Sequence, residues 1–190
     1  MIQLDVLCIG FLERDFEGEL TAAHSTSTLI RAEGRNIVVD VSTPYMWPAV
    51  KTSFRQIGIF PEDVDTVILT HTHSDHVGNL KRYPKAKVYV HKGGKSEISG
   101  ATVVEDDEFQ ICPGVRMVHT PGHCTEESSV FIEADRRYVC AGDAVPLEGN
   151  LKENKAPALN TDRRLALESI ERIRRYADVV IPGHGAPFIV

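Results

Sequence analysis

Residues 71–76 read His-Thr-His-Ser-Asp-His and directly follow a β-branched, apolar run. In an extended chain His71 and His73 point to the same side, because successive side chains alternate between the two faces of a strand. Asp75 and His76 come where the chain is expected to turn, so both can aim at a neighbouring point. Four metal-binding side chains this close together exceed what one tetrahedral ion with an open position requires. The motif therefore predicts a centre with two metal ions rather than a solvated polar loop.

Three further segments place a ligand-type side chain beside a glycine at the end of a predicted strand, and they contribute His123, Asp143 and His184. Glycine allows the backbone to turn sharply at such an end. Each segment alone is a weak signal, but the combined set contains five histidines and two aspartates. This set suits two zinc ions, with one carboxylate bridging them and a water or hydroxide completing the pair; iron or manganese is the alternative. The predicted metal ligands are His71, His73, Asp75, His76, His123, Asp143 and His184.

Short β-branched runs bounded by Gly, Pro, Asn or Asp predict the strands that position these side chains. The predicted strands are Leu4–Ile9, Thr26–Ala32, Asn36–Asp40, Val64–Thr70, Lys87–Val90, Val115–Thr120, Ser128–Glu133, Arg137–Ala141 and Val179–Pro182. A helix is predicted over Asp162–Ala177, capped by Asn160 or Thr161. Shorter helices are predicted over Pro48–Ile57 and from Asp75 or His76 to before Arg82. Blocks of strands with interspersed helices predict an α/β or α+β fold in which helices cover two sheets.

The composition is that of an ordinary soluble protein, and the 190 residues predict a single domain over residues 1–190. A net charge of −6 disfavours nucleic acid as a partner, although it does not exclude a local basic groove. No apolar run approaches the roughly 20 residues that span a bilayer, and the N-terminus lacks the pattern of a secretory signal. Four cysteines without a C-x-x-C pair indicate buried, reduced thiols in a cytoplasmic protein. We expect a small-molecule substrate and no membrane partner, with a homodimer as one candidate assembly.

The order Asp40, His71–His76, His123, Asp143, His184 resembles the metallo-β-lactamase superfamily. The segments 76–80 and 182–188 resemble the branch of metallo-β-lactamase domain-containing protein 1, which implies kinship with glyoxalase II-like hydrolases. The resemblance implies a four-layer αββα sandwich with the metals at one edge between the sheets. It also implies that Asp40 orients ligand loops without binding metal. The implied first ion is held by His71, His73 and His123, the second by Asp75, His76 and His184, and Asp143 bridges the two.

The expected chemistry is hydrolysis by a metal-bridging hydroxide, with Asp75 or Asp143 taking up the proton. A small ester or thioester is the preferred substrate, because the 13–25 segment is acidic and would repel a polyphosphate backbone. The alternative is a metal-dependent endoribonuclease or phosphodiesterase, which the subfamily resemblance favours. A mononuclear iron persulfide dioxygenase and a non-catalytic binding module are weaker alternatives, the latter because relatives of that kind lose ligands.

Three more histidines lie outside this set. His24 is predicted to be a surface residue, with substrate contact as the alternative. His91 and His119 lie at strand ends and are predicted to be hydrogen-bonded structural residues. The segment Pro146–Asn160 follows Asp143 and is either a wall of the substrate cleft or a plain connector.

Overall fold

The structure, a computed structural model, describes residues 1–94 and 98–190, and most of its strands belong to two six-stranded sheets. The first sheet contains, in spatial order, β1 (Gln3–Cys8), β4 (Ser27–Ala32), β5 (Arg35–Val39), β6 (Thr66–Ile68), β7 (Lys87–His91) and β8 (Thr102–Val104). The second contains β14 (Phe188–Ile189), β13 (Val179–Pro182), β12 (Arg137–Gly142), β11 (Ser128–Glu133), β10 (Val115–His119) and β9 (Glu108–Cys112). A separate hairpin consists of β2 (Phe11–Arg14) and β3 (Leu20–His24).

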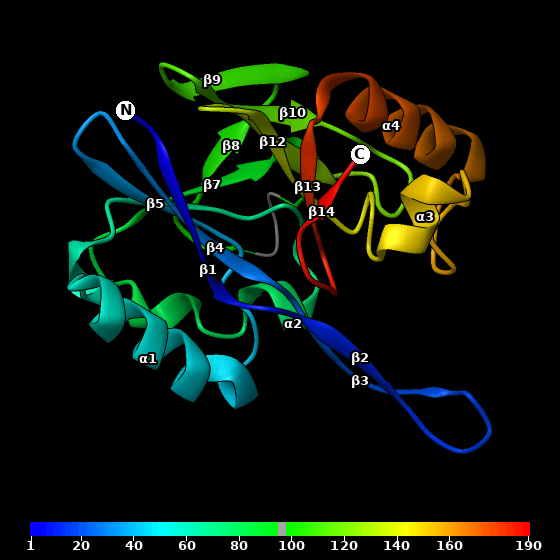
Figure 1. The fold of residues 1–190 in the computed structure, drawn as a ribbon, viewed down its shortest axis with the longest axis horizontal. Helices are drawn as coiled ribbons and strands as arrows, with labels where there is room; N and C mark the ends of the chain where they lie inside the picture. The colour runs from blue at the N-terminus through cyan, green and yellow to red at the C-terminus, as the bar shows by residue number, and fades with distance from the viewer. Residues whose placement is uncertain (95–97) are drawn as a thin grey trace.

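The two sheets pack face to face, and helices cover their outer faces (Figure 1). Apolar side chains such as Ile30 and Ile132 fill the space between the sheets. Helix α1 (Trp47–Ile57) packs on the first sheet, and helix α4 (Arg163–Tyr176) packs on the second. This order of layers confirms the predicted four-layer αββα sandwich. Among the described residues, no helix is long and apolar enough to cross a membrane.

Helix α4 is amphipathic, as its sequence pattern predicts, and its buried stripe includes Ile170 and Ile173. Its N-cap is Asp162 rather than the predicted Asn160 or Thr161, because the Asp162 side chain accepts a hydrogen bond from the Leu165 amide at 3.0 Å. The Thr161 amide instead donates to the carbonyls of the segment that carries His123. The start of α4 is therefore joined directly to one of the candidate metal-binding loops.

Several short elements differ from the prediction. Strands β2, β3, β8, β9 and β14 were not predicted, because the first two form a largely solvated hairpin and the others are short strands at or next to sheet edges. The segment 146–160 contains a short helix, α3 (Glu148–Lys152), and the predicted strand Val64–Thr70 shortens to β6. The helix predicted to begin at Asp75 or His76 is α2, which covers Ser74–Val77 only and so contains the end of the histidine motif. Single 3₁₀ turns cover Pro44–Met46, Pro61–Asp63, Leu80–Arg82 and Lys92–Gly94.

Parallel pairing brings the candidate residues to one edge of the sandwich. Strand β5 is parallel to β6 in the first sheet, and β12 is parallel to β13 in the second. The carboxyl ends of each pair therefore lie side by side. Asp40 follows β5, the histidine motif follows β6, Asp143 follows β12, and His184 follows β13 after one intervening residue. The topology thus gathers side chains that are distant in sequence.

Candidate metal centre

All seven predicted ligands lie together at this edge, in overlapping groups of potential metal donors. In the first group the ring nitrogens of three histidines converge. His71 Nε2 and His123 Nε2 each lie 3.0 Å from His73 Nδ1. His71 is fully buried and His123 nearly so, while His73 is the exposed member. The resemblance assigned these residues to one ion, and the structure brings their donor atoms to one point.

The second group combines two histidines with two carboxylates. Asp75 Oδ2 lies 3.4 Å from His76 Nε2 and 3.5 Å from His184 Nε2. Asp143 Oδ1 lies 3.5 Å from His76 Nε2 and 3.2 Å from His184 Nε2. The other oxygen of Asp143, Oδ2, lies 3.6 Å from His123 Nε2 in the first group. Asp143 is therefore placed between the two groups, where a bridging carboxylate is expected.

The ring nitrogens that face away from the centre have acceptors, and these acceptors determine the tautomers. His123 Nδ1 lies 2.8 Å from the Leu159 carbonyl oxygen, and His184 Nδ1 lies 2.9 Å from the His24 carbonyl oxygen. A carbonyl can only accept, so both Nδ1 atoms carry hydrogen, and in the neutral rings both Nε2 atoms keep a free lone pair. Such outward hydrogen bonds are typical of histidines that bind metal.

His71 and His76 are oriented in the same way by carboxylates. His76 Nδ1 lies 2.8 Å from Asp40 Oδ2, and His71 Nδ1 lies 3.2 Å from Glu127 Oε2. Their Nε2 atoms consequently point into the centre. His76 Nε2 and Asp143 Oδ1 are buried, and neither has a hydrogen-bond partner among the described residues. Buried polar atoms without partners are costly in a folded protein, and a cation between them would satisfy both.

The charges at the centre are strongly coupled. Burial lowers the pKa of His71 well below its ordinary value, and the neighbouring His76 lowers it further. Burial also opposes charge on His76, but the carboxylates of Asp40 and Asp143 raise the pKa of this histidine above its ordinary value. His76 and His184 in turn lower the pKa of Asp143, although burial acts in the opposite direction. At His76 and Asp143 opposite charges thus compensate for burial, and a divalent cation suits the same environment.

Asp40 lies beneath the centre rather than in it. Its carboxylate accepts hydrogen bonds from the Thr70 amide and the Thr70 hydroxyl, both at 2.8 Å, besides its contact with His76. The Asp40 backbone has a φ of 52°, a left-handed conformation that is uncommon outside glycine. Asp40 thereby fixes the position of Thr70, which directly precedes the histidine motif, and the orientation of the His76 ring. Asp40 therefore occupies the position predicted for a carboxylate that orients the ligand loops.

Glu127 is a site residue that the sequence analysis missed. Its fully buried carboxylate faces His71 through Oε2 and accepts the Asp143 amide through Oε1 at 3.0 Å. The neighbouring Gly142 has a φ of 54°, and a Cβ there would lie 2.4 Å from Glu127 Oε1. Burial and the nearby Asp143 raise the pKa of Glu127. The available signal was a carboxylate four positions after His123, immediately before the strand Ser128–Glu133, whose first five residues are buried.

The remaining histidines give mixed outcomes. His24 is 7% exposed, so the prediction of a surface residue was wrong: its ring packs between Phe11 and Tyr45, at 4.8 Å from each ring. His119 Nε2 contacts the Thr125 carbonyl oxygen at 2.8 Å, as expected of a structural histidine. His91 is buried but has no hydrogen-bond partner among the described residues, which differs from the prediction. It stacks instead on His119 at 3.8 Å.

The cysteines are buried, as the sequence predicts. All four are free thiols and all four are buried. Burial and the carboxylates of Glu127 and Glu126 raise the pKa of Cys124, so this thiol beside His123 is not activated.

Comparisons with known proteins agree with this geometry. Residues 20–100 match the family model described as the metallo-beta-lactamase superfamily. A protein of Methanocaldococcus jannaschii named "Probable metallo-hydrolase" is 35% identical over 186 residues, covering 96% of this chain and 87% of the relative. Metallo-beta-lactamase domain-containing protein 1 of Xenopus laevis is 33% identical over 193 residues, covering 97% and 80%. The crystal structure of a B. thuringiensis AiiA mutant with N-decanoyl-L-homoserine bound at the active site aligns with a TM-score of 0.75 at 18% identity, covering 96% and 92%. This chain belongs to the metallo-β-lactamase superfamily.

Proposed function

We propose that this chain is a dinuclear metal-dependent hydrolase, with zinc as the metal and a small carboxylic ester or thioester as the substrate. The observation that carries the proposal is the convergence of bare imidazole nitrogens and carboxylate oxygens from the ends of several strands. Donors of this kind suit zinc better than the all-oxygen sites of magnesium or calcium. When bound, the two cations would supply Lewis acidity and lower the pKa of water from about 15.7 toward 7.

Each group of side chains has a place in this proposal. The first cation would be held by His71, His73 and His123, the second by Asp75, His76 and His184, and Asp143 would contact both. The side chains of Asp75 and Asp143 are 15% and 12% exposed, so solvent reaches a small part of each. Asp75 turns Oδ2 toward the histidines, which leaves Oδ1 to take up a proton from water and return it to the leaving group.

The preference for a small acyl compound rests on exposed apolar side chains near the centre. The Leu159 carbonyl holds His123, and the Pro146 carbonyl, one residue before Leu147, accepts the His184 amide. Leu147 and Leu159 are exposed, and so is Tyr45, which stacks on His24. Apolar surface at the mouth of a polar centre favours substrates with an apolar acyl group. The fold shared with a protein that holds N-decanoyl-L-homoserine supports the same class, and cyclic esters fall within it.

The proposal is tested by turnover of a substrate panel with zinc-loaded protein. The panel contains nitrophenyl esters of increasing acyl length, an acyl thioester, an acyl homoserine lactone and a fluorogenic single-stranded RNA. We expect the ester-type substrates to be turned over faster than the RNA, and activity to be lost in His73→Ala. We also expect Leu159→Ser to raise KM for the long acyl esters more than for acetate. Phe60→Ser, which changes another exposed apolar side chain, serves as the matched control.

Efficient metal-dependent cleavage of the RNA, with ester hydrolysis near background, would replace this proposal with the endoribonuclease alternative. Oxidation of a persulfide by protein that holds one iron would replace it with the dioxygenase alternative.

A further inference from the structure

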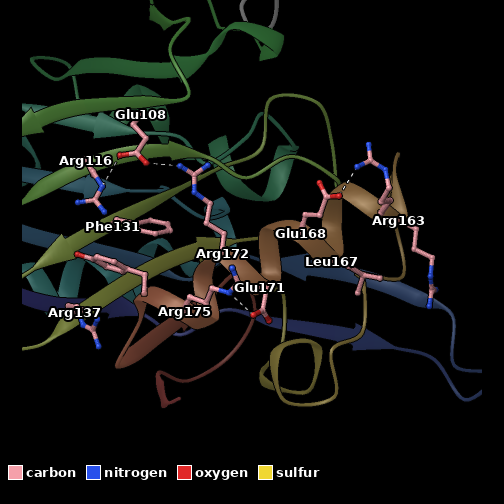
Figure 2. A pocket seen from close by; sticks show the side chains of 12 residues that line it. Glu108, Arg116, Phe131, Arg137, Arg163, Leu167, Glu168, Glu171, Arg172 and Arg175 are labelled. Carbon is pink, nitrogen blue, oxygen red and sulfur yellow. Dashed lines mark hydrogen bonds and ion pairs between the residues drawn. The ribbon is translucent and has the colours of Figure 1, made fainter.

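A large groove lies on the outer face of the second sheet, away from the metal centre. It has a volume of about 1020 Å³ and runs between α4 and the exposed parts of strands β9–β12 (Figure 2). Its lining residues are Glu108, Arg116, Phe131, Arg137, Arg163, Arg164, Leu167, Glu168, Glu171, Arg172, Arg175 and Tyr176. None of the seven candidate metal ligands lies among them. We refer to this surface as the α4 groove.

The α4 groove is basic in a chain that is acidic as a whole. Its lining contains six arginines and three glutamates, which gives a local charge of +3, whereas the chain carries −6. Some of this charge is only partly compensated. Arg116 and Arg172 share the single carboxylate of Glu108, at 3.3 and 2.7 Å. Within the described part of the chain, Arg163 makes no salt bridge. An acidic partner would therefore be attracted to this groove.

The floor of the groove is apolar and aromatic. Phe131 and Tyr176 pack against each other at 4.7 Å, and the Arg116 guanidinium lies over both rings. The Tyr176 hydroxyl is buried and has no hydrogen-bond partner among the described residues. Leu167 extends the apolar surface along the helix. A partner that fits this floor needs an aromatic or aliphatic side chain together with its acidic groups.

The β2–β3 hairpin of the same chain has these complementary properties. Its segment 11–20 carries four acidic residues and one arginine, a local charge of −3. Phe16 at its tip is fully exposed to solvent, and Leu20 is also exposed. The turn is ordered by the Asp15 carboxylate, which accepts the amides of Glu17 and Glu19 at 2.9 Å each. The hairpin thus presents an apolar side chain surrounded by carboxylates on a structured turn.

We propose that the hairpin tip of one copy docks in the α4 groove of a second copy. The tip projects away from both sheets and lies apart from α4 in the same copy (Figure 1), so the contact requires two molecules. Phe16 enters the aromatic floor, and the carboxylates of Glu17 and Glu19 face the arginines of the rim. Each copy carries both surfaces, so reciprocal docking closes a symmetric dimer with two identical contacts. This interface is independent of the proposed hydrolase activity.

The test is the association state of the metal-loaded protein, measured by sedimentation velocity over a range of protein and salt concentrations. We expect a dimer whose dissociation constant rises with salt, because the contact is largely electrostatic. We expect Phe16→Ser to weaken dimerisation by about tenfold or more, as for an aromatic side chain at the centre of an interface. Phe60→Ser, an exposed phenylalanine outside both surfaces, is expected to leave the dimer unchanged.

Charge-reversal variants test the contact between the hairpin and the α4 groove more specifically. Glu17→Lys/Glu19→Lys in the hairpin and Arg163→Glu/Arg175→Glu in the groove should each weaken self-association. An equimolar mixture of the two double variants should restore dimers that contain one copy of each. In such a dimer the native hairpin of the groove variant meets the native groove of the hairpin variant, and in the other contact the charges of both surfaces are reversed. At concentrations where the wild type is also monomeric, thermal unfolding and metal content of each variant should match the wild type, which separates loss of contact from loss of fold.

Three results would overturn the inference. One is a wild-type protein that stays monomeric at every concentration, and another is a dimer that survives all of these substitutions. The third is binding of a labelled oligonucleotide that is lost in Arg163→Glu/Arg175→Glu and unaffected by the hairpin variants. That third result would assign the α4 groove to a nucleic acid.

Discussion

The histidines of the centre are oriented by their outward hydrogen bonds. Nδ1 of His123 and of His184 donates to a backbone carbonyl, and Nδ1 of His76 faces the Asp40 carboxylate. Each of these contacts fixes both the plane of the ring and the nitrogen that carries hydrogen. The Nε2 atoms are consequently directed at one another across the centre. Only a Lewis acid or a proton makes such an arrangement favourable.

Replacing Asp40 with asparagine tests this orientation. The amide keeps the size of the side chain, but it removes the negative charge that faces His76. We expect both ions to remain bound with an affinity reduced about 10–100-fold, the usual effect of losing a carboxylate that supports a ligand. Competition with a chromophoric chelator measures the affinity, and Asp135→Asn on the surface is the control. Complete loss of one ion would mean that Asp40 is itself a ligand.

The buried His91, which lies outside the metal centre, should make the free energy of unfolding depend on pH. Burial, together with the facing His119 and Lys92, lowers its pKa to about 4, against the opposing effect of Asp107 and Glu126. The folded protein therefore keeps His91 neutral, whereas the unfolded chain protonates it at its ordinary value of 6.5. The stability contributed by this neutral ring is full above pH 6.5 and is lost as the pH falls toward 4.

The variant His91→Leu removes this titration. We expect the free energy of unfolding of the wild type to fall faster than that of the variant between pH 6.5 and 4, by at most about 1.4 kcal/mol per pH unit. Chemical denaturation at several pH values measures the difference. Parallel pH profiles for the two proteins would show that His91 does not titrate differently in the folded and unfolded states.

At the level of strands and helices, the centre is formed by residues at the ends of several strands rather than by any single motif. The loops after β5, β6, β12 and β13 deliver side chains to one edge of the sandwich. Helix α4 stabilises this edge from outside, because the amides of Thr161 and Asp162 both donate to the Gly122 carbonyl beside His123. The cap of α4 and the loop of His123 are therefore one structural unit.

Asp162→Ala tests the cap. Removing the acceptor for the Leu165 amide should lower the free energy of unfolding by about 1 kcal/mol, within the usual range of roughly 0.5–2. Asp162→Asn, which retains a capping oxygen, should lose much less. Equilibrium denaturation of the three proteins measures both effects. Equal losses in the two variants would show that the charge of Asp162, rather than its cap, matters.

The strand-end pattern made much of the fold and centre predictable. A buried strand followed by ligand-type side chains and glycine located His71, Asp143 and His184 without any knowledge of tertiary contacts. Such local signals could not reveal Glu127, whose role depends on Asp143 and His71 approaching it from other strands. They also missed the β2–β3 hairpin, because a largely solvated hairpin lacks the alternation that identifies a half-buried strand. The burial of His24 likewise depends on aromatic neighbours supplied by separate segments.

The molecule as a whole separates two kinds of surface. One edge of the sandwich carries the candidate metal centre with exposed apolar side chains near it. The outer face of the second sheet carries the basic α4 groove, in a chain whose net charge is −6. The base of the β2–β3 hairpin lies at the metal centre, because the carbonyl of His24, the last residue of β3, accepts a hydrogen bond from His184. The tip of the hairpin carries the exposed Phe16. A dimer formed through this hairpin would therefore place an intermolecular contact on the element that supports one metal ligand.

Metal stoichiometry is the most direct test of a two-ion hydrolase. Protein loaded with zinc and freed of excess metal should contain two zinc ions per chain by elemental analysis. His76→Ala should reduce this value to about one, because the group of His71, His73 and His123 stays intact. A single ion per chain in the fully loaded wild type, iron in particular, with no second site at any metal concentration, would contradict the dinuclear account.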